Sequence, residues 1–552
     1  MNINWDKTKI PIILSIIIVG SFTGFFFLFL KNKNNKEDWI SDYRDIPVYL
    51  PNPGGIDFGM NIGGINDWGR EWPFTNLMKM CRPWLTGNDH WVSGGDNLWD
   101  TGLIDQIQCD EDGYPLELPL DFGLEALQIV HTGFASMYNL PLGTYVFLYE
   151  GEGEFEFTGN WYVINNTPGR YVLNLTNTNS FNGIRIQSSI FGNHARNFRL
   201  IQSEYEVSYL DNLFNPVWLE KLSDFSTVRF MDWGKTNFHD SLENWNNRSL
   251  VSEYCYSHDK GVPYEIMIEL CNLLDKDAWV CVPHEASNDY ISQMAQLFYN
   301  NLEPELTLYV EYSNELWNWM FPCSHYCHDN GNLSVPWPER IVPFIQNALD
   351  IFTSVFSGDS SRLKRVVGIQ AGWFDVGNRT ISNIDQESFD IVSPTAYFGF
   401  NDDAISFLNQ KGEYTTVEDV FNLAVNGIDE NIIPSIALYL NRTIELGKKL
   451  MFYEAGQHLT PDPFGSIQPY GQVLVDIQYH DAIYYLYNYL FNRIRDLRDN
   501  VDYEENFLMM IFSFASGPSV QYGTWGVLPD IFLEPPYMPE APKYQSILDN
   551  LI

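Results

Sequence analysis

Short apolar segments alternate with longer amphipathic ones over most of this chain, and this alternation restricts its possible folds. From residue 212 onward the apolar segments lie at 227–233, 278–284, 306–312, 365–371, 389–397, 449–454 and 507–516. The stretches between them have helical periodicity, which predicts parallel β/α units, because parallel strands need a crossover that is usually a helix. The segment at 56–62 adds an eighth strand. Eight such units favour an α/β fold, a (β/α)8 TIM barrel, with 45–115 holding the first strand and its loop.

A different pattern separates the first and second of these strands. Residues 116–204 form short alternating segments divided by turn residues, with no helical period. This pattern predicts an inserted all-β sandwich. We therefore assign residues 205–552 to the remainder of the barrel.

The N-terminal region contains an uncharged apolar stretch at 10–30, between a short tail (1–9) and a polar linker (31–44). As a helix it would be roughly 30 Å long, enough to cross a bilayer. A signal peptide is the alternative, but lysines follow directly at positions 31, 33 and 36 in place of a small-residue cleavage site. The sequence predicts a single-pass membrane anchor, and the flanking lysines do not decide its orientation.

The charge and the aromatic content of the chain limit the kinds of partner that it can bind. The formal net charge is -39, which argues against a nucleic-acid partner, since phosphate binding needs clustered Lys and Arg. Aromatic residues make up 16% of the chain, and flat amphipathic rings can stack on sugar faces. A large barrel also buries many aromatic rings, so any single ring can equally be part of the core.

Two glutamates follow strands that are far apart in sequence. Asn314 and Glu315 come after the fourth strand, and Glu454 ends the seventh. The carboxyl ends of all barrel strands meet at one rim, and two carboxylates about 5 to 5.5 Å apart can cleave a glycosidic bond with retention. We expect Glu315 to be the acid/base, beside Trp317, and Glu454 to be the nucleophile. Each glutamate alone would more often be a surface or helix N-terminal charge.

Glu285 and Glu311 are rival carboxylates near the same strand ends. Glu311 ranks below Glu315, because it should point sideways into the barrel wall or lumen.

These segments resemble the clan A glycoside hydrolases, including family 5, whose catalytic glutamates end strands four and seven of a (β/α)8 barrel. In that clan an Asn precedes the acid/base, as Asn314 does here, and contacts the sugar 2-hydroxyl. Leu316 stands where the clan usually has proline. The blocks V-E-Y-S-N-E-L-W-N and F-G-M-N-I-G-G-I-N-D-W also resemble uncharacterised, membrane-anchored barrel proteins related to the clan.

The resemblance implies roles for further residues at the same rim. It implies that His284 and Tyr397 orient the carboxylates, that Trp525 forms the floor of the sugar site, and that Arg229 or Asp232 supports the site from the second strand. On residue type alone, His284 and Tyr397 could instead be buried core residues. Further candidates for stacking on sugars are Trp68, Trp72, Trp233 and Trp317.

We expect no cofactor and no metal. The run Cys323 to His328 contains zinc-ligand residue types, but no second ligand pair stands out, which favours a disulfide or a plain loop there.

The sequence thus predicts a membrane-anchored retaining glycoside hydrolase that acts on a polysaccharide or glycan, with its body extracellular or lumenal. Six N-x-S/T sequons would suit that location. The alternative is a non-catalytic glycan-binding or structural surface protein on the same barrel. An esterase is a weaker alternative, since there is no G-x-S-x-G elbow. The oligomeric state is not predicted.

Overall fold

The computed structural model describes residues 46–89, 99–124, 126–135, 139–238, 242–460, 462, 465–501 and 503–551. The expected membrane helix at 10–30 and its linker lie outside these residues. Within the described ranges no helix has both the length and the apolar character needed to cross a bilayer.

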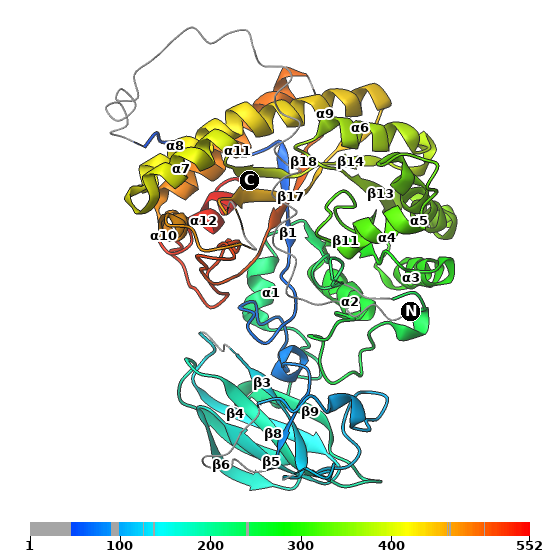
Figure 1. Ribbon diagram of the computed structural model, residues 1–552, viewed down its shortest axis with the longest axis vertical. Helices are drawn as coiled ribbons and strands as arrows, with labels where there is room; N and C mark the ends of the chain where they lie inside the picture. The colour runs from blue at the N-terminus through cyan, green and yellow to red at the C-terminus, as the bar shows by residue number, and fades with distance from the viewer. Residues whose placement is uncertain are drawn as a thin grey trace. The chain divides into compact units, whose positions relative to one another are not determined.

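Ten short parallel strands form the main sheet (Figure 1). They are β1 (Ile56–Asn61), β10 (Thr227–Arg229), β11 (Asp277–Val282), β12 (Leu308–Tyr312), β13 (Leu363–Gly368), β14 (Ile391–Ser393), β15 (Ala396–Gly399), β16 (Lys449–Leu450), β17 (Phe452–His458) and β18 (Phe507–Phe512). All eight strand segments expected from the sequence are therefore present, although their ends differ by several residues.

The pairing of these strands describes a ring. β1 pairs with β10 and β18, and successive parallel pairs lead from β10 through β14. The sixth and seventh strands are each divided in two, so that β14 pairs with β16 and β15 with β17, which then pairs with β18. Pro394 lies in the break of the sixth strand, where its missing N–H cannot join the ladder. Eight strand positions thus form a TIM-like barrel.

Helices lie outside the strands of this barrel (Figure 1). They are α1 (Pro216–Leu222), α2 (Tyr264–Leu274), α3 (Asn288–Asn301), α4 (Pro322–Asn330), α5 (Val342–Val355), α6 (Phe374–Asn383), α7 (Asp402–Lys411), α8 (Val417–Gly427), α9 (Ile433–Leu446), α10 (Gly471–Asp476), α11 (Asp481–Asn500) and α12 (Pro542–Leu548). Their ends follow local chemistry: Ser287 caps α3, and Thr416 and Asp419 form a reciprocal capping box on α8.

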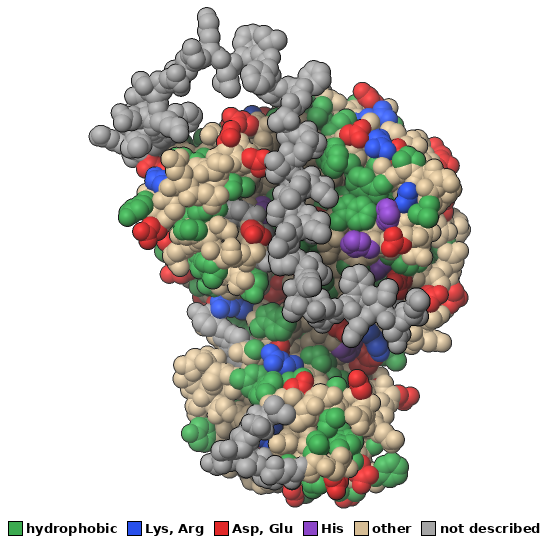
Figure 2. All heavy atoms as spheres, viewed as in Figure 1, with side chains coloured by type: hydrophobic (Ala, Val, Ile, Leu, Met, Phe, Trp, Pro, Cys, Tyr) green, Lys and Arg blue, Asp and Glu red, His purple; other side chains and the backbone are tan. Residues whose placement is uncertain are grey.

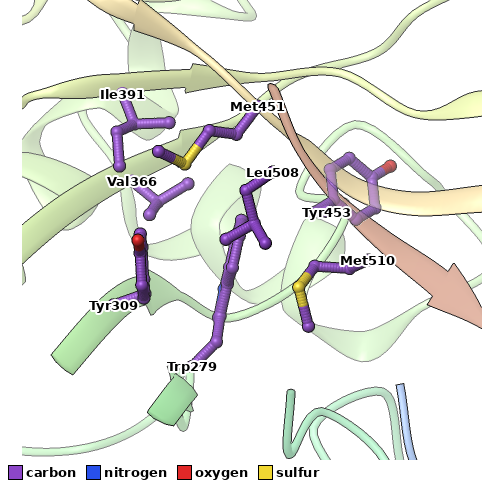
Figure 3. Packing of buried hydrophobic residues seen from close by; sticks show 8 residues of the cluster. All are labelled: Trp279, Tyr309, Val366, Ile391, Met451, Tyr453, Leu508 and Met510. Atoms are coloured by element: carbon purple, nitrogen blue, oxygen red, sulfur yellow. The ribbon is translucent and has the colours of Figure 1, made fainter. Parts of the chain in front are cut away.

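One cluster of buried side chains fills the barrel interior (Figure 3). Strands three to eight each contribute at least one inward-facing residue to it: Trp279, Tyr309, Val366, Ile391, Met451, Tyr453, Leu508 and Met510. The Trp279 and Tyr309 rings stack with centroids 5.5 Å apart. A filled interior leaves the strand ends as the place for a functional site.

Two four-stranded antiparallel sheets lie between β1 and β10 in the sequence. Their orders are β2-β3-β8-β5 and β6-β7-β4-β9. The strands are β2 (Leu85–Asn88), β3 (Gln128–Phe134), β4 (Gly143–Glu150), β5 (Gly153–Thr158), β6 (Trp161–Thr167), β7 (Arg170–Leu175), β8 (Asn182–Ser189) and β9 (Arg196–Gln202).

Aromatic contacts connect the two sheets. Phe147 of β4 lies 4.9 Å from Phe155 of β5, and Phe198 of β9 lies 5.3 Å from the same ring. The β-rich region begins earlier than the expected boundary at 116, because β2 belongs to it. Four residues of β2 carry too little alternation to reveal a strand in the sequence.

Candidate active site

A buried arginine connects the strands that carry the two predicted catalytic glutamates. Arg229, at the end of β10, is fully buried. Its Nη1 donates to Glu454 Oε1 and to Asn61 Oδ1, each at 3.0 Å. Its Nη2 donates to Glu311 Oε2 and to Asn314 Oδ1, each at 2.9 Å. Four side chains on, or just after, the three strands β1, β12 and β17 are therefore fixed around one guanidinium.

Glu454 lies on β17 with both carboxylate oxygens hydrogen-bonded. Arg229 donates to Oε1, and the hydroxyl of Tyr397, on β15, donates to Oε2 at 3.0 Å. The chain needs glycine two residues later: Gly456 has φ +127°, and a Cβ there would lie 2.8 Å from the Tyr487 hydroxyl oxygen. These contacts hold the Glu454 carboxylate in one orientation.

Glu315 lies beyond the end of β12 and is partly exposed. Its Oε1 accepts from the Tyr453 hydroxyl at 2.9 Å, and its Oε2 accepts from Asn318 Nδ2 at 2.8 Å. Because Tyr453 and Glu454 are neighbours on β17, both glutamates are tied to the same strand. Both predicted catalytic carboxylates thus belong to one group of contacts.

The backbone around Asn314 is strained. Ser313 and Glu315 have φ values of 56° and 45°, which cost roughly 1–3 kcal/mol each for non-glycine residues. Asn314 itself is buried, accepts from Arg229, and donates to Asn237 Oδ1 at 3.0 Å. Strain of this kind persists only where surrounding contacts fix the chain, and such positions cluster at functional sites.

Glu311 is directed into the barrel, where it pairs with Arg229. Its Oε2 also accepts from Trp279 Nε1 at 3.1 Å, and a Cβ on Gly368 would lie only 2.4 Å from its Oε1. A carboxylate with these partners and 2% exposure cannot reach a substrate. It is a counter-charge for Arg229.

Burial governs the electrostatics of the site. It raises the pKa of Glu454 to about 8, nearby Glu315 acts in the same direction, and Arg229 and the Tyr397 hydroxyl oppose both by favouring the charged form. Burial also raises the pKa of Asp232, which follows β10, to about 6. Carboxyls with raised pKa values at the strand ends are a feature of sites that transfer protons.

Trp525 and Tyr397 form an aromatic group on the Glu454 side. Their ring centroids are 6.0 Å apart, and His458, four residues after Glu454, lies 5.1 Å from Trp525 and 5.8 Å from Tyr397. Trp317 packs against Tyr453 with centroids 6.3 Å apart. Trp68, on the loop after β1, is 62% exposed, and its described contacts do not include either glutamate.

Several expected substrate contacts do not fit the positions of the residues. Trp233 is fully buried and stacks on Trp218 at 6.0 Å, and Trp72 is 1% exposed, so neither ring is open to a sugar. Arg229 is also fully buried, so it holds the glutamates in place but cannot itself contact a sugar. His284 is 2% exposed, and its ring packs 5.5 Å from Tyr326.

Cys323 and Cys327 are free thiols on α4. Cys323 Sγ donates to the Asn314 carbonyl at 3.2 Å, and Cys327 contacts the Tyr312 hydroxyl at 3.9 Å. Of the two alternatives that the sequence left open here, a disulfide and a plain loop, the structure shows neither, since both thiols are free and lie on a helix. Cys323 instead supports the strained turn that positions Asn314.

Other members of the site were not predicted: Asn61, Asn237, Asn318, Tyr453 and His458. Asn61, at the end of β1, donates to the carbonyls of Tyr453, Met510 and Ile511. A signal was available for Tyr453 and His458, which lie within the segment that carries Glu454. Asn61 and Asn237 offered none, because hydrogen bonds between segments far apart in the sequence leave no spacing pattern, whereas Asn318 lies only three residues after Glu315.

No protein-family model matches the chain, and no curated protein matches its sequence. Similar solved structures include the GH51 arabinofuranosidase from Xanthomonas axonopodis pv. citri, with 12% identity over 54% of this chain and 59% of that one, at a TM-score of 0.32. GH10 from Paenibacillus barcinonensis has 11% identity over 60% of this chain and 89% of that one, at a TM-score of 0.37. A β-glucosidase from Thermotoga maritima in complex with azafagomine has 10% identity over 60% of this chain and 85% of that one, at a TM-score of 0.31. With TM-scores below 0.5, these similarities carry no weight for substrate or mechanism.

Proposed function

We propose that this protein is a retaining glycoside hydrolase, with Glu454 as nucleophile and Glu315 as acid/base. The observation that carries the proposal is the difference between the surroundings of the two carboxylates. Glu454 is buried between Arg229 and Tyr397, both of which favour its charged form. Glu315 is partly exposed and has only neutral donors, Tyr453 and Asn318. A buried carboxylate fixed in one orientation suits the nucleophile, and a partly exposed one suits the group that exchanges protons with the departing oxygen and with water.

In the first step a Glu454 oxygen attacks the anomeric carbon, and the glycosidic bond breaks. Glu315 gives its proton to the departing oxygen. In the second step Glu315 takes a proton from water, the water oxygen bonds to the anomeric carbon, and the Glu454 ester is released. Arg229 and Tyr397 hold Glu454 and do not themselves exchange protons.

The substrate class that fits is a neutral glycan. With a formal net charge of -39, the molecule repels uronic-acid and sulfated chains, and no free cation among the described contacts at Glu315 or Glu454 would offset that repulsion. Aromatic residues beside both glutamates would stack on sugar faces.

The test is hydrolysis of a panel of aryl β-glycosides and neutral β-linked polysaccharides by the full-length chain in detergent. Glu454→Gln should abolish turnover. Glu315→Ala should lose about 10²- to 10⁴-fold on substrates with poor leaving groups. With an activated leaving group, azide should restore Glu315→Ala and yield a glycosyl azide of retained configuration.

Glu285→Gln is the matched control: Glu285 follows β11, and no described hydrogen bond or ion pair joins it to Glu315 or Glu454, so the activity of this variant should match the wild type. A wild-type protein that binds glycans from the panel but cleaves none would refute the proposal and favour a binding module. Inverted products would refute the retaining mechanism alone.

We also propose that residues 10–30 anchor the protein, with its body extracellular or lumenal. Support comes from the sequence stretch alone. The full chain should stay with membranes through alkaline carbonate extraction, and a chain that begins at residue 45 should not. Release of the full chain by carbonate would rule out the anchor.

A further inference from the structure

Three tryptophans from three loops, which connect β12 with α4, α4 with α5 and β13 with α6, form a continuous group, here called the tryptophan wall. Trp319 and Trp337 follow β12, and Trp373 follows β13. The Trp319 and Trp337 centroids are 6.0 Å apart, and those of Trp337 and Trp373 are 6.3 Å apart. Trp319 is 41% exposed and Trp373 is 51% exposed. Hydrophobic and histidine side chains gather on the face that carries α4 (Figure 2).

Polar contacts hold the tryptophan wall in place. On α4, His325 Nε2 lies 2.9 Å from the Trp319 carbonyl oxygen, and the His328 ring lies 5.3 Å from the Trp319 ring. On α6, Arg379 donates to the Trp337 carbonyl at 3.0 Å and pairs with Glu339 at 2.6 Å. Exposed aromatic rings whose backbone is fixed in this way lose little entropy on binding a ligand.

The tryptophan wall adjoins Glu315 and not Glu454. Asn318, the residue before Trp319, donates to Glu315 Oε2 at 2.8 Å, and its carbonyl accepts from Ser324 Oγ at 2.7 Å. In a glycosidase the acid protonates the departing oxygen, so the groups beside it face the leaving part of the substrate. Trp525 and His458 lie on the nucleophile side.

We propose that the tryptophan wall binds the leaving-group sugars of a neutral, β-linked oligosaccharide or polysaccharide chain. This inference rests on the proposed function, since the role of Glu315 decides which part of the substrate faces the wall. Three successive rings, with centroids 6.0 and 6.3 Å apart, offer stacking area for more than one sugar, which a small aglycone would not occupy. The substrate class is therefore a glycan chain with sugar units on both sides of the scissile bond.

Binding is tested on the full-length Glu454→Gln protein, with cellohexaose, mannohexaose and xylohexaose as probes in calorimetric titrations. In that background Trp319→Ala and Trp373→Ala should each weaken binding of the preferred hexasaccharide by about 2- to 12-fold, as expected for loss of an aromatic contact. Trp99→Ala is the matched control: Trp99 is 40% exposed, but it packs against His131 and Phe181 of the insertion. Its affinity should stay unchanged.

Kinetics of the variants with Glu454 intact separate this inference from the proposed function. Trp319→Ala should lower kcat/KM on the hexasaccharide by a similar factor and leave kcat/KM on an aryl β-glycoside unchanged. The inference would be overturned if kcat/KM fell equally on both substrates or if the hexasaccharide affinity stayed unchanged. It would also be overturned if no probe bound at millimolar concentration. If the wild type hydrolyses nothing but the tryptophan variants bind more weakly, the proposed function fails and the wall remains a glycan site.

Discussion

Arg229 places the carboxylate groups of Glu311 and Glu454 on opposite sides of one guanidinium. Loss of Arg229 would leave buried carboxylates without a counter-charge, and breaking a buried ion pair in this way costs about 3–5 kcal/mol. The arrangement at Arg229 is therefore as much a requirement for folding as for chemistry.

The Tyr397 hydroxyl should set the acid side of the pH profile. It favours the charged form of Glu454, so Tyr397→Phe should raise the pKa of Glu454 further. Since Glu454 must be ionised to attack, the acidic limb of kcat/KM should move up by about one pH unit, and activity should still rise with pH through that limb.

Tyr487→Phe is the control for that measurement. Tyr487 is also buried, and its hydroxyl lies 3.3 Å from the Gln457 N–H on the same strand, away from Glu454. An acidic limb that moves equally in both variants, or in neither, would contradict the assigned role of Tyr397.

The sequence indicated which residues could do chemistry better than how they are held. The positions of Glu315, Glu454, Asn314 and Tyr397 were predictable, because each lies at or just after the end of a recognisable strand, and their chemical roles stay predictions. Burial of Arg229 was not, since an arginine at a strand end can equally face solvent, and only the barrel's closure brings four acceptors around it.

Among the structural elements, the loop after β1 is attached to its neighbours through a buried carboxyl. Glu71 accepts from the Gly63 N–H at 2.7 Å, the Ala515 N–H at 3.3 Å and Trp218 Nε1 at 3.3 Å. It thereby connects the ends of β1 and β18 with α1. Burial raises its pKa to about 8.

Because the folded-state pKa of Glu71 exceeds the unfolded value, its contribution to stability is complete below about pH 4.5 and is lost as pH rises toward 8. Glu71→Gln should therefore flatten the fall in unfolding free energy between pH 5 and 8, by roughly a few kcal/mol over the range. Urea unfolding at three pH values measures this. If the unfolding free energies of the two proteins fall in parallel as the pH rises, Glu71 does not titrate between pH 5 and 8.

Strand identity followed from apolar runs, but strand boundaries did not. The sixth and seventh strands read as single segments in the sequence, yet each is divided in the structure. Pro394 explains one break locally, whereas the break near Met451 depends on its pairing with the already divided sixth strand. A pairing effect of this kind has no local signal.

For the whole molecule, charge should weaken the folded state at low ionic strength. A formal net charge of -39 produces self-repulsion, and raising NaCl from 10 to 150 mM shortens the screening length from about 30 to about 8 Å. The unfolding midpoint Tm should rise by about 2 °C or more over that interval. A Tm that stays constant or falls would show that self-repulsion does not weaken the folded state.

The group around Arg229 has an odd number of charges. With Glu454 ionised, one cation faces two anions, and the excess negative charge lies inside the protein. Conversion of Glu454 to a glycosyl ester would remove that excess and leave the balanced pair of Arg229 and Glu311. On the proposed double displacement, the charges around Arg229 are thus balanced when Glu454 is protonated or esterified, and they carry an excess negative charge only when Glu454 is ionised for attack. The same count makes Glu454→Gln a well-balanced protein in which to trap an intact substrate.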